Sequence, residues 1–132
     1  LLDAPCSSER HVFTDAKYLA EWTPSRIKTS TIAQWALLSS AYRMLNPEGC
    51  ILYSTCALAP AENDGIVGRL LKKFDTAKIV LDVISFERQR LLPFCDTLFP
   101  EAEKTKYGFH VLPDVQNGAG PIYFSLIRKT VL

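Results

Sequence analysis

Two cysteines in this chain occupy positions where a thiol can take part in chemistry. Cys6 follows Leu1-Leu2-Asp3-Ala4-Pro5, and Cys56 follows Tyr53-Ser54-Thr55. Each comes after apolar residues that predict a buried strand, at the point where the strand gives way to a loop. Exposed backbone N–H groups and a nearby helix N-terminus favour the thiolate, which is the nucleophilic form of cysteine. The two stretches therefore predict a reactive pair of thiols, if the fold brings the strand ends together.

The elements between the two cysteines are those that must position them. Residues 1–3 are expected to be the tail of a strand, and residues 50–54 form a near-continuous apolar run that predicts a strand buried on both faces. Thr31-Ile32-Ala33-Gln34 matches a capping box and predicts a helix from there to about Leu45. Strand, helix and strand in this order form a right-handed parallel crossover. We therefore expect both cysteines to open onto one crevice at the carboxyl edge of the sheet.

The rest of the chain is expected to complete an α/β unit. Residues 4–28 are predicted to be a long loop with one irregular helical turn at 15–21, and residues 46–49 a turn in which Gly49 accepts a positive φ. The later elements are predicted to be a helix that starts at Pro60, a strand at 78–84, a loop with a short helix at 86–106, and a final strand pair at 107–112 and 122–126. The buried positions are expected to be Ile32, Trp35, Leu38, Tyr42 and Leu45 on the first helix, and Ile66, Val67, Leu70, Leu71 and Phe74 on the second.

Composition excludes some functions and leaves others open. The 132 residues carry 15 basic and 14 acidic side chains, so the charge balance alone does not favour a dedicated nucleic-acid binder. No apolar run approaches the length of a membrane span. Four basic residues near the first motif either line a phosphate path or belong to a solvated surface: Arg10, Lys17, Arg26 and Lys28.

The cysteine spacing argues against metal binding and against a disulfide framework. The four cysteines, at 6, 50, 56 and 95, form no Cys-x-x-Cys pair, and no histidine stands at zinc-finger spacing. An α/β unit of this kind is also typical of reducing compartments. Cys50 and Cys95 are expected to be buried and to pack as small hydrophobic residues.

An ordered set of motifs resembles one enzyme family, the NOP/Sun (RsmB-like) RNA cytosine-5 methyltransferases. Asp3-Ala4-Pro5-Cys6-Ser7 is similar to the fourth motif of that family, and Ser54-Thr55-Cys56-Ala57-Leu58 is similar to its sixth. Glu62-Asn63 stands where the family has an acid-Asn pair, and Gly120-Pro121-Ile122-Tyr123-Phe124, followed by Leu126 and Lys129, resembles its closing motif. The resemblance implies the C-terminal half of a Rossmann-like class I methyltransferase sheet that ends in an antiparallel strand pair. Residues 1–132 are then a partial domain, whose cofactor-binding N-terminal half lies outside this sequence.

The resemblance also implies a chemistry and a role for each residue. Cys56 would be the nucleophile that attacks C6 of cytosine, and Cys6 would assist release of the adduct. Asp3 would contact the N3/N4 edge of the flipped base, and Asp3 and Pro5 would lie beside S-adenosyl-L-methionine. The substrate would be structured RNA, either rRNA or tRNA, delivered with the help of an N-terminal extension or an RNA-binding protein partner. The isolated segment is expected to be inactive.

The same resemblance suggests a subgroup and a location. The run Cys6-Ser7-Ser8-Glu9-Arg10-His11, together with the Gly-Pro-Ile-Tyr-Phe ending, looks nearest to the mitochondrial rRNA and tRNA enzymes. This similarity implies a mitochondrial location, and otherwise a nucleolar or cytoplasmic one. No metal and no membrane association are expected.

Two other classes of function stay open from the sequence. One is a non-catalytic methyltransferase-like module that acts in RNA or ribosome assembly. The other is a cysteine hydrolase that uses His11 or His110 as its base. His110 lies within a predicted strand, in Phe109-His110-Val111, where a core or edge histidine is the alternative reading.

Overall fold

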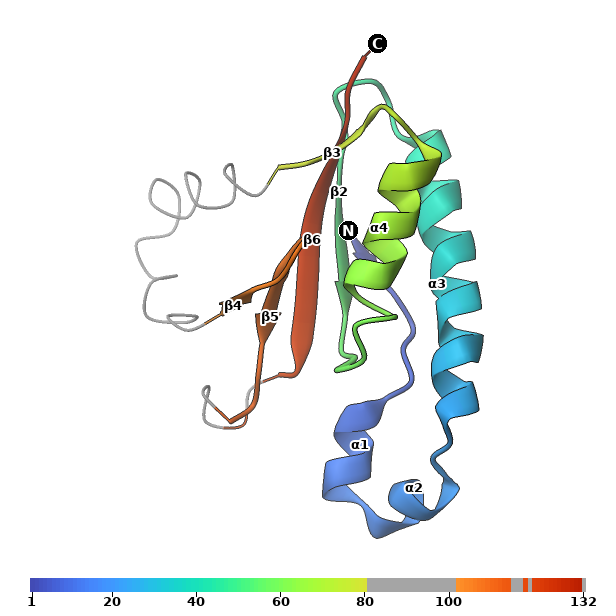
Figure 1. Ribbon diagram of the computed structural model, residues 1–132, viewed down its shortest axis with the longest axis vertical. Coiled ribbons are helices and arrows are strands. Elements are labelled where there is room, and N and C mark those ends of the chain that lie inside the picture. The colour runs from blue at the N-terminus through green and yellow to red at the C-terminus, as the bar shows by residue number, and fades with distance from the viewer. Residues whose placement is uncertain (81–101, 115–117, 119, 132) are drawn as a thin grey trace.

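The structure, a computed structural model, describes residues 1–80, 102–114, 118 and 120–131. Its centre is a mixed sheet in the order β1-β2-β6-β5-β4, with β3 also paired to β6. Figure 1 shows α3 and α4 against one side of this sheet, and α1 and α2 beyond the end of β2. The strands are β1 Leu2–Asp3, β2 Cys50–Thr55, β3 Ala77–Ile79, β4 Glu103–Lys104, β5 Phe109–Val111 and β6 Ile122–Lys129, and the helices are α1 Glu9–Thr14, α2 Ala16–Glu21, α3 Pro24–Met44 and α4 Asp64–Lys73.

The pairing of the strands brings the ends of β1 and β2 to the same edge of the sheet. β1 is parallel to β2, with Leu2 opposite Tyr53 and Asp3 opposite Ser54. β6 is antiparallel to β2, β3 and β5, so one long strand holds the sheet together. The α/β class, the parallel crossover and the final antiparallel pair are therefore confirmed.

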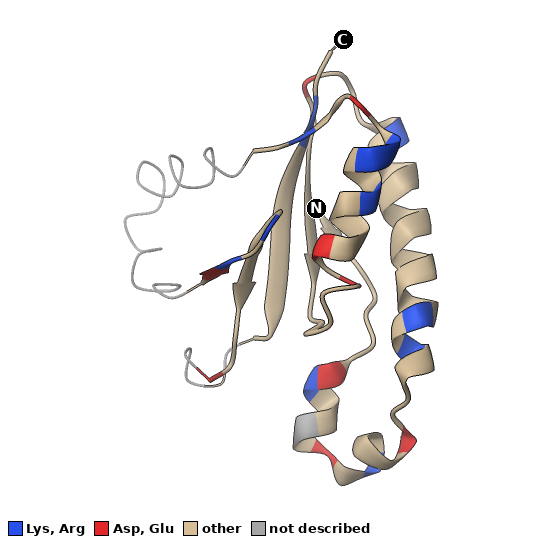
Figure 2. Ribbon diagram, in the orientation of Figure 1, with Lys and Arg blue, Asp and Glu red and all other residues tan. Residues whose placement is uncertain are grey.

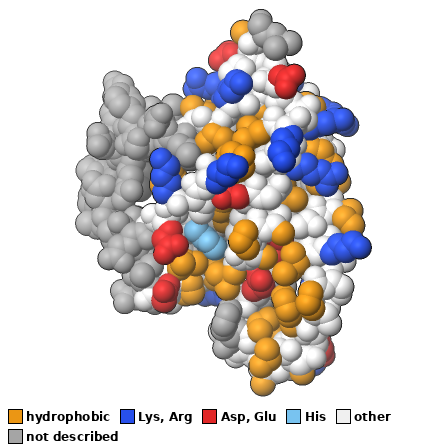
Figure 3. Space-filling view, viewed as in Figure 1, with side chains coloured by type: hydrophobic (Ala, Val, Ile, Leu, Met, Phe, Trp, Pro, Cys, Tyr) orange, Lys and Arg blue, Asp and Glu red, His pale blue; other side chains and the backbone are white. Residues whose placement is uncertain are grey.

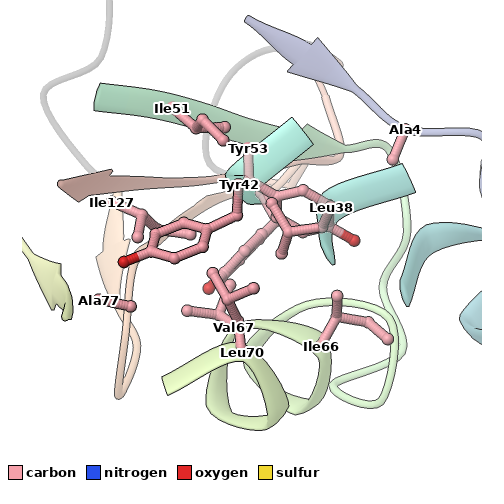
Figure 4. Packing of buried hydrophobic residues seen from close by; sticks show 11 residues of the cluster. Ala4, Leu38, Tyr42, Ile51, Tyr53, Ile66, Val67, Leu70, Ala77 and Ile127 are labelled. Carbon is pink, nitrogen blue, oxygen red and sulfur yellow. The ribbon is translucent and has the colours of Figure 1, made fainter. Parts of the chain in front are cut away.

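The core lies between the sheet and the two long helices (Figure 4). α3 contributes buried side chains at Leu38 and Tyr42, and α4 contributes its predicted core face. Residues of one strand alternate between the two faces, so only every second residue of β2 and β6 reaches this core. Burial of this apolar surface is the main favourable term for folding. The main buried members are Leu38, Tyr42, Ile51, Tyr53, Ile66, Val67, Leu70 and Ile127.

The predicted start of the long helix is wrong. α3 begins at Pro24, with Thr23 as its N-cap residue, because proline is well suited to the first turn of a helix. The capping-box residue Thr31 lies inside the helix, and its hydroxyl donates to the Lys28 carbonyl at 2.8 Å. The region expected to be a loop, residues 4–28, therefore contains α1, α2 and the first turns of α3.

The buried side of α3 also differs from the prediction. Ile32 is 61% exposed, whereas Gln34 is fully buried. The buried stripe runs through Gln34, Leu38 and Tyr42 at four-residue steps, so it is rotated away from Ile32. Trp35 and Leu45 pack partly buried at the edge of the core.

Two further local predictions, the start of α4 and the residue with positive φ in the turn at 46–49, were wrong. α4 begins at Asp64, because residues 60–63 form a turn closed by the Gly65 N–H, which donates to the Pro60 carbonyl at 2.9 Å. In the turn at 46–49 the positive φ falls on Glu48. Gly49 is needed for space instead, because a Cβ there would lie 2.9 Å from the Asn46 carbonyl oxygen.

β2 is not buried on both faces along its whole length. Cys50 and Leu52 are exposed, on the face of the strand turned away from α3 and α4, whereas Ile51 and Tyr53 are buried. The expectation of a buried Cys50 is therefore wrong. Cys95 and most of the predicted strand at 78–84 and loop at 86–106 lie outside the described residues. Within its described part, that loop contains the short strand β4.

Candidate active site

The two predicted cysteines meet at the carboxyl ends of β1 and β2. The Ala4 N–H donates to the Ser54 carbonyl at 2.9 Å and extends the parallel pairing by one residue. Beyond it, Cys6 and Cys56 are joined as a disulfide, with their Cα atoms 6.3 Å apart. The expectation that both cysteines lie together at one edge of the sheet is confirmed. The expectation against disulfides is wrong for this pair, because the crossover places the two side chains in bonding contact.

The other two predicted site residues lie at the same edge of the sheet. Asp3 is exposed, and its Oδ1 accepts a hydrogen bond from the Ser54 hydroxyl at 3.1 Å. Pro5 is also exposed, and its carbonyl accepts the Gln34 side-chain amide at 2.9 Å. The structure thus gathers Asp3, Pro5 and both cysteines at one edge, with one Asp3 oxygen free of protein partners among the described residues.

A buried carboxylate holds the segment that carries Cys6. Glu62 is fully buried and precedes α4. It accepts the Ser7 N–H at 2.9 Å, the Ser7 hydroxyl, and the Gln34 side-chain amide at 2.9 Å. A carboxylate removed from water is tolerated only when hydrogen bonds replace its hydration. Glu62 therefore fixes the residue next to Cys6 against the segment that follows Cys56.

A second carboxylate makes the reciprocal connection. Glu9, in the first turn of α1, accepts the backbone N–H groups of Leu58 at 2.6 Å and Ala59 at 2.9 Å. Glu62, from the segment after Cys56, thus binds the residue after Cys6, and Glu9, from the segment after Cys6, binds the residues after Cys56. We call this pair, Glu9 and Glu62, the carboxylate clamp. It fixes the relative position of the two loops that carry the thiols.

The turn that contains Cys56 is closed by its neighbours. The Thr55 hydroxyl donates to the Asn63 side-chain oxygen at 2.6 Å, and the Asn63 amide donates to the Ala57 carbonyl at 2.9 Å. The Ala57 N–H returns a bond to the Thr55 hydroxyl at 3.2 Å. These bonds leave Cys56 itself exposed at the tip of an otherwise buried turn. A sulfur in this position is open to solvent and to a bound molecule.

Asp64 joins the start of α4 to the turn between β4 and β5 and to β6. Its carboxylate accepts the Tyr123 hydroxyl at 2.8 Å, the Thr105 hydroxyl at 2.9 Å, and the N–H groups of Lys106 at 2.9 Å and Tyr107 at 3.0 Å. Burial, and then Asp64, raise the pKa of Tyr123. Burial, and then Glu62, likewise raise the pKa of Tyr53. Both phenols therefore stay neutral and act as hydrogen-bond donors.

The two histidines occupy different environments. His11 is exposed and packs against Tyr18, with ring centroids 5.1 Å apart. His110 is half-buried, and burial lowers its pKa against the opposing effects of the Ala57 backbone and of nearby carboxylates. Its Nε2 is buried and has no partner among the described residues. His110 therefore lies close to Ala57, in the turn of Cys56, and its side chain is neutral.

Sequence reasoning identified the cysteines and Asp3 but missed the residues that position them. Glu9 was seen only as part of a motif, and Gln34 only as the end of a capping box. Glu62 was named through the acid-Asn pair of the resembled family, but no positioning role was predicted for it. Its partner Ser7 lies 55 positions away, so no local pattern connects the two.

Within the described part of the chain, no group of three or more potential ligands could hold a metal ion. None of the described helices has the combination of length and apolar character needed to cross a bilayer.

Comparison with known proteins gives a consistent assignment. The sequence model of the family described as 16S rRNA methyltransferase RsmB/F matches residues 1–112. The chain is 36% identical to the ribosomal RNA small subunit methyltransferase F of Erwinia tasmaniensis and to that of Aeromonas salmonicida, over 98% of this chain and 25% of each relative. The chain thus spans about a quarter of the length of these relatives. They are bacterial enzymes, so the expected mitochondrial subgroup finds no support in them.

Solved structures agree on the fold. The protein PH0851 superposes with a TM-score of 0.70 at 22% identity, over 97% of this chain and 26% of its own. The structure of NSun6 from Pyrococcus horikoshii with SFG superposes with a TM-score of 0.63 at 20% identity, over 99% of this chain and 29% of its own. The sheet of this chain therefore corresponds to part of the class I methyltransferase fold.

Proposed function

Because this chain belongs to the RsmB/F family of 16S rRNA methyltransferases, we propose that the full-length protein methylates carbon 5 of a cytosine in structured RNA. The methyl donor is S-adenosylmethionine, and the RNA is ribosomal or transfer RNA in the bacterial cytoplasm. The observation that carries the proposal is the meeting of Cys6 and Cys56 at adjacent parallel strand ends. One thiol suffices for addition to a base, and a second at the same place allows the adduct to be resolved.

Cys56 forms the bond to the substrate. Its thiolate adds to C6 of the cytosine, which breaks the aromaticity of the ring and moves electron density to C5. S-adenosylmethionine, when bound, supplies an electrophilic methyl group for that carbon. The C5 proton then leaves, the ring electrons return, and the Cys56 thiolate is expelled from C6. Cys6 assists this release from the neighbouring strand end.

Asp3 fits a role beside the base and the donor. Its carboxylate is exposed and receives one bond from Ser54, so it keeps acceptor sites for other groups. An acid at the N3 edge of cytosine favours protonated N3, which makes C6 more electrophilic. Pro5 is exposed next to it and can line the same space. We assign no other contact with the cofactor to this chain.

The reduced form of the cysteine pair is the active form. A sulfur engaged in the Cys6–Cys56 disulfide cannot add to a base, because the thiolate is the nucleophile. Activity therefore depends on a reductant that returns both cysteines to thiols.

The test is methyl transfer to RNA by the reduced full-length protein. We expect Cys56→Ala to abolish incorporation of 5-methylcytosine, measured by mass spectrometry of digested RNA. Cys50→Ala is the matched control, because Cys50 is an exposed free thiol at the other end of the same strand. Full activity in Cys56→Ala would overturn the proposed mechanism.

The second candidate function is a non-catalytic module in RNA or ribosome assembly. The Cys56→Ala variant distinguishes it from the methyltransferase. In that case the reduced wild-type protein transfers no methyl group, and Cys56→Ala leaves ribosome assembly in cells unaffected.

A further inference from the structure

A cavity of about 300 Å³ lies beside Cys6 and is not used in the mechanism above. It opens between the segment that leaves β1 and the first two turns of α3, which run side by side in Figure 1. Cys6, Ser7 and Ser8 line one side, and Ser25, Arg26, Thr29 and Ser30 line the other.

The lining is suited to an anion. The one formal charge among these lining residues is the guanidinium of Arg26, which is half-buried. The hydroxyls of Ser7, Ser8 and Thr29 donate within the protein, to Glu62, to the Cys6 carbonyl and to the Ser25 carbonyl. Ser30 keeps its hydroxyl free of partners among the described residues, and Ser25 pairs only with the exposed Thr23 hydroxyl. Ser25 and Arg26 also stand in the first turn of a helix of 21 residues, where the helix dipole favours negative charge. A guanidinium matches the geometry of phosphate oxygens, and the hydroxyls of Ser25 and Ser30 stand beside it as donors.

Charges of both signs lie around the cavity: Arg26 lines it, and the buried carboxylate of Glu62 lies behind Ser7, whose N–H and hydroxyl it accepts. Figure 2 shows two short blue stretches of ribbon, which mark basic residues, near the N-terminal end of α3 and beside the segment that descends from β1. The nearest acidic residue in the sequence of that segment, Glu9, already accepts the N–H groups of Leu58 and Ala59. Its carboxylate is therefore directed toward the Cys56 loop, and it is not part of the cavity lining.

We propose that this cavity binds a phosphodiester group of the RNA strand at the target cytosine, with Arg26 as its principal contact. The inference rests on the proposed function, because a base that reaches Cys6 and Cys56 brings its own backbone phosphates with it. The cavity adjoins Cys6 directly, so it lies where such a phosphate must be received. Arg26 thereby holds the strand while the base lies against the thiols.

The first test compares two arginines of the same helix in the full-length protein. Arg26→Ala should raise the KM for RNA about tenfold and leave kcat at saturating RNA unchanged. The slope of log binding constant against log salt should fall by about 0.7–0.9, as expected for one lost phosphate contact. Arg43→Ala removes the same charge from the exposed C-terminal turn of α3, about 26 Å away along the helix, and should change neither value.

A second pair of variants tests the cavity without removing Arg26. Ser25→Glu places a carboxylate in the lining, at a helix position where an acidic residue stabilises the fold. We expect this variant to fold and to bind RNA at least tenfold more weakly. Ser25→Gln, which is similar in size and uncharged, should stay within about threefold of wild type.

The outcomes separate this inference from the proposed function. RNA binding is measured without cofactor, so its salt slope does not depend on methyl transfer. Equal slopes for Arg26→Ala and Arg43→Ala, or a fall in kcat with an unchanged KM, would overturn the phosphate site while leaving the methyltransferase proposal intact. Stabilisation by inorganic phosphate that Arg26→Ala abolishes, with unchanged RNA binding, would show a site for free phosphate and overturn the RNA assignment. A wild type that binds RNA with the expected slope but transfers no methyl group would contradict the proposed function alone.

Discussion

At the scale of single residues, the two site cysteines are chemically identical, so their positions must give them different roles. If Cys56 forms the bond to C6 and Cys6 assists release, Cys6→Ala should allow addition and methylation but stall expulsion of the thiolate. RNA should then stay covalently attached to the protein. A denaturing gel of the full-length variant with RNA and S-adenosylmethionine should show a retarded band that ribonuclease removes.

The result for the other cysteine provides the control. Cys56→Ala should give no such band, because it lacks the attacking sulfur. If Cys56→Ala accumulates the adduct and Cys6→Ala does not, the thiol of Cys6 is the nucleophile and the two roles must be exchanged.

His110 gives a prediction for pH dependence. Burial holds its folded-state pKa below the ordinary value of about 6.5, so the unfolded chain binds a proton that the native protein does not. Its stabilising contribution is therefore present above about pH 6.5 and is lost as the pH falls from there toward the lowered pKa of the folded state. His110→Gln should flatten this part of the curve of unfolding midpoint against pH. The exposed His11→Gln should leave it unchanged, and equal curves for wild type and His110→Gln would contradict the assignment.

The place of the candidate site residues in the fold could be predicted from the sequence, whereas most of the contacts that hold them could not. Cys6 and Cys56 follow apolar strands and Asp3 ends one, and this local pattern gives their place in the fold. The motif resemblance singled out Glu62-Asn63, but the contacts of Glu62 appear only in three dimensions, because its partners Ser7 and Gln34 lie 55 and 28 positions away. A buried carboxylate with distant partners leaves no periodic signal in the chain.

At the scale of elements, the apolar pattern of α4 predicted its buried face correctly, whereas the capping pattern at residues 31–34 predicted the wrong start for α3. β2 was confirmed as a strand, although it is not buried on both faces as its apolar run predicted, and the core face of α4 was confirmed because a helical stripe leaves a repeated signal. The start of α3 was wrong because Thr31 and Gln34 satisfy the capping pattern by coincidence. Gln34 is buried for another reason, since its amide joins Pro5 to Glu62. Packing against other elements therefore determined which face of α3 is buried.

The carboxylate clamp that joins α1 to the α4 segment gives a prediction about stability. Glu62→Ala leaves the Ser7 N–H, the Ser7 hydroxyl and the Gln34 amide without their buried acceptor, so the free energy of unfolding should fall by about 3 kcal/mol. Glu9→Ala should cost only about 1 kcal/mol, because its partners Leu58 and Ala59 are half-buried and water can replace the carboxylate.

Urea unfolding of the full-length protein measures both changes. Glu21→Ala, an exposed glutamate at the end of α2, is the matched control and should stay within about 0.5 kcal/mol of wild type. Equal costs for Glu62→Ala and Glu21→Ala would mean that Glu62 does not hold the Cys6 loop.

At the scale of the whole molecule, the distribution of charge limits what this segment does with RNA. In Figure 2, Lys and Arg residues gather mainly around the upper end of α4 and the neighbouring end of α3, and Figure 3 shows basic side chains gathered on the upper part of the same face. β2 runs toward the opposite end, where Cys56 and Cys6 lie. Few basic residues therefore stand near the thiols, and Arg26 is the one that lines a cavity there. Most of the phosphate contacts of a structured RNA must then come from outside these 132 residues.

The same reasoning applies to the cofactor and gives the last prediction. A ligand that binds only the native state raises stability by mass action, by about 2.7 kcal/mol at one hundred times its Kd. Saturating S-adenosylmethionine should therefore raise the Tm of the full-length protein by several degrees in a calorimeter. Asp3→Ala should reduce this shift, because Asp3 is the exposed carboxylate expected beside the donor. Asp75→Ala removes an exposed carboxylate in the turn between α4 and β3 and should keep the full shift. No shift in the wild type would leave the assembly module as the better account of the protein.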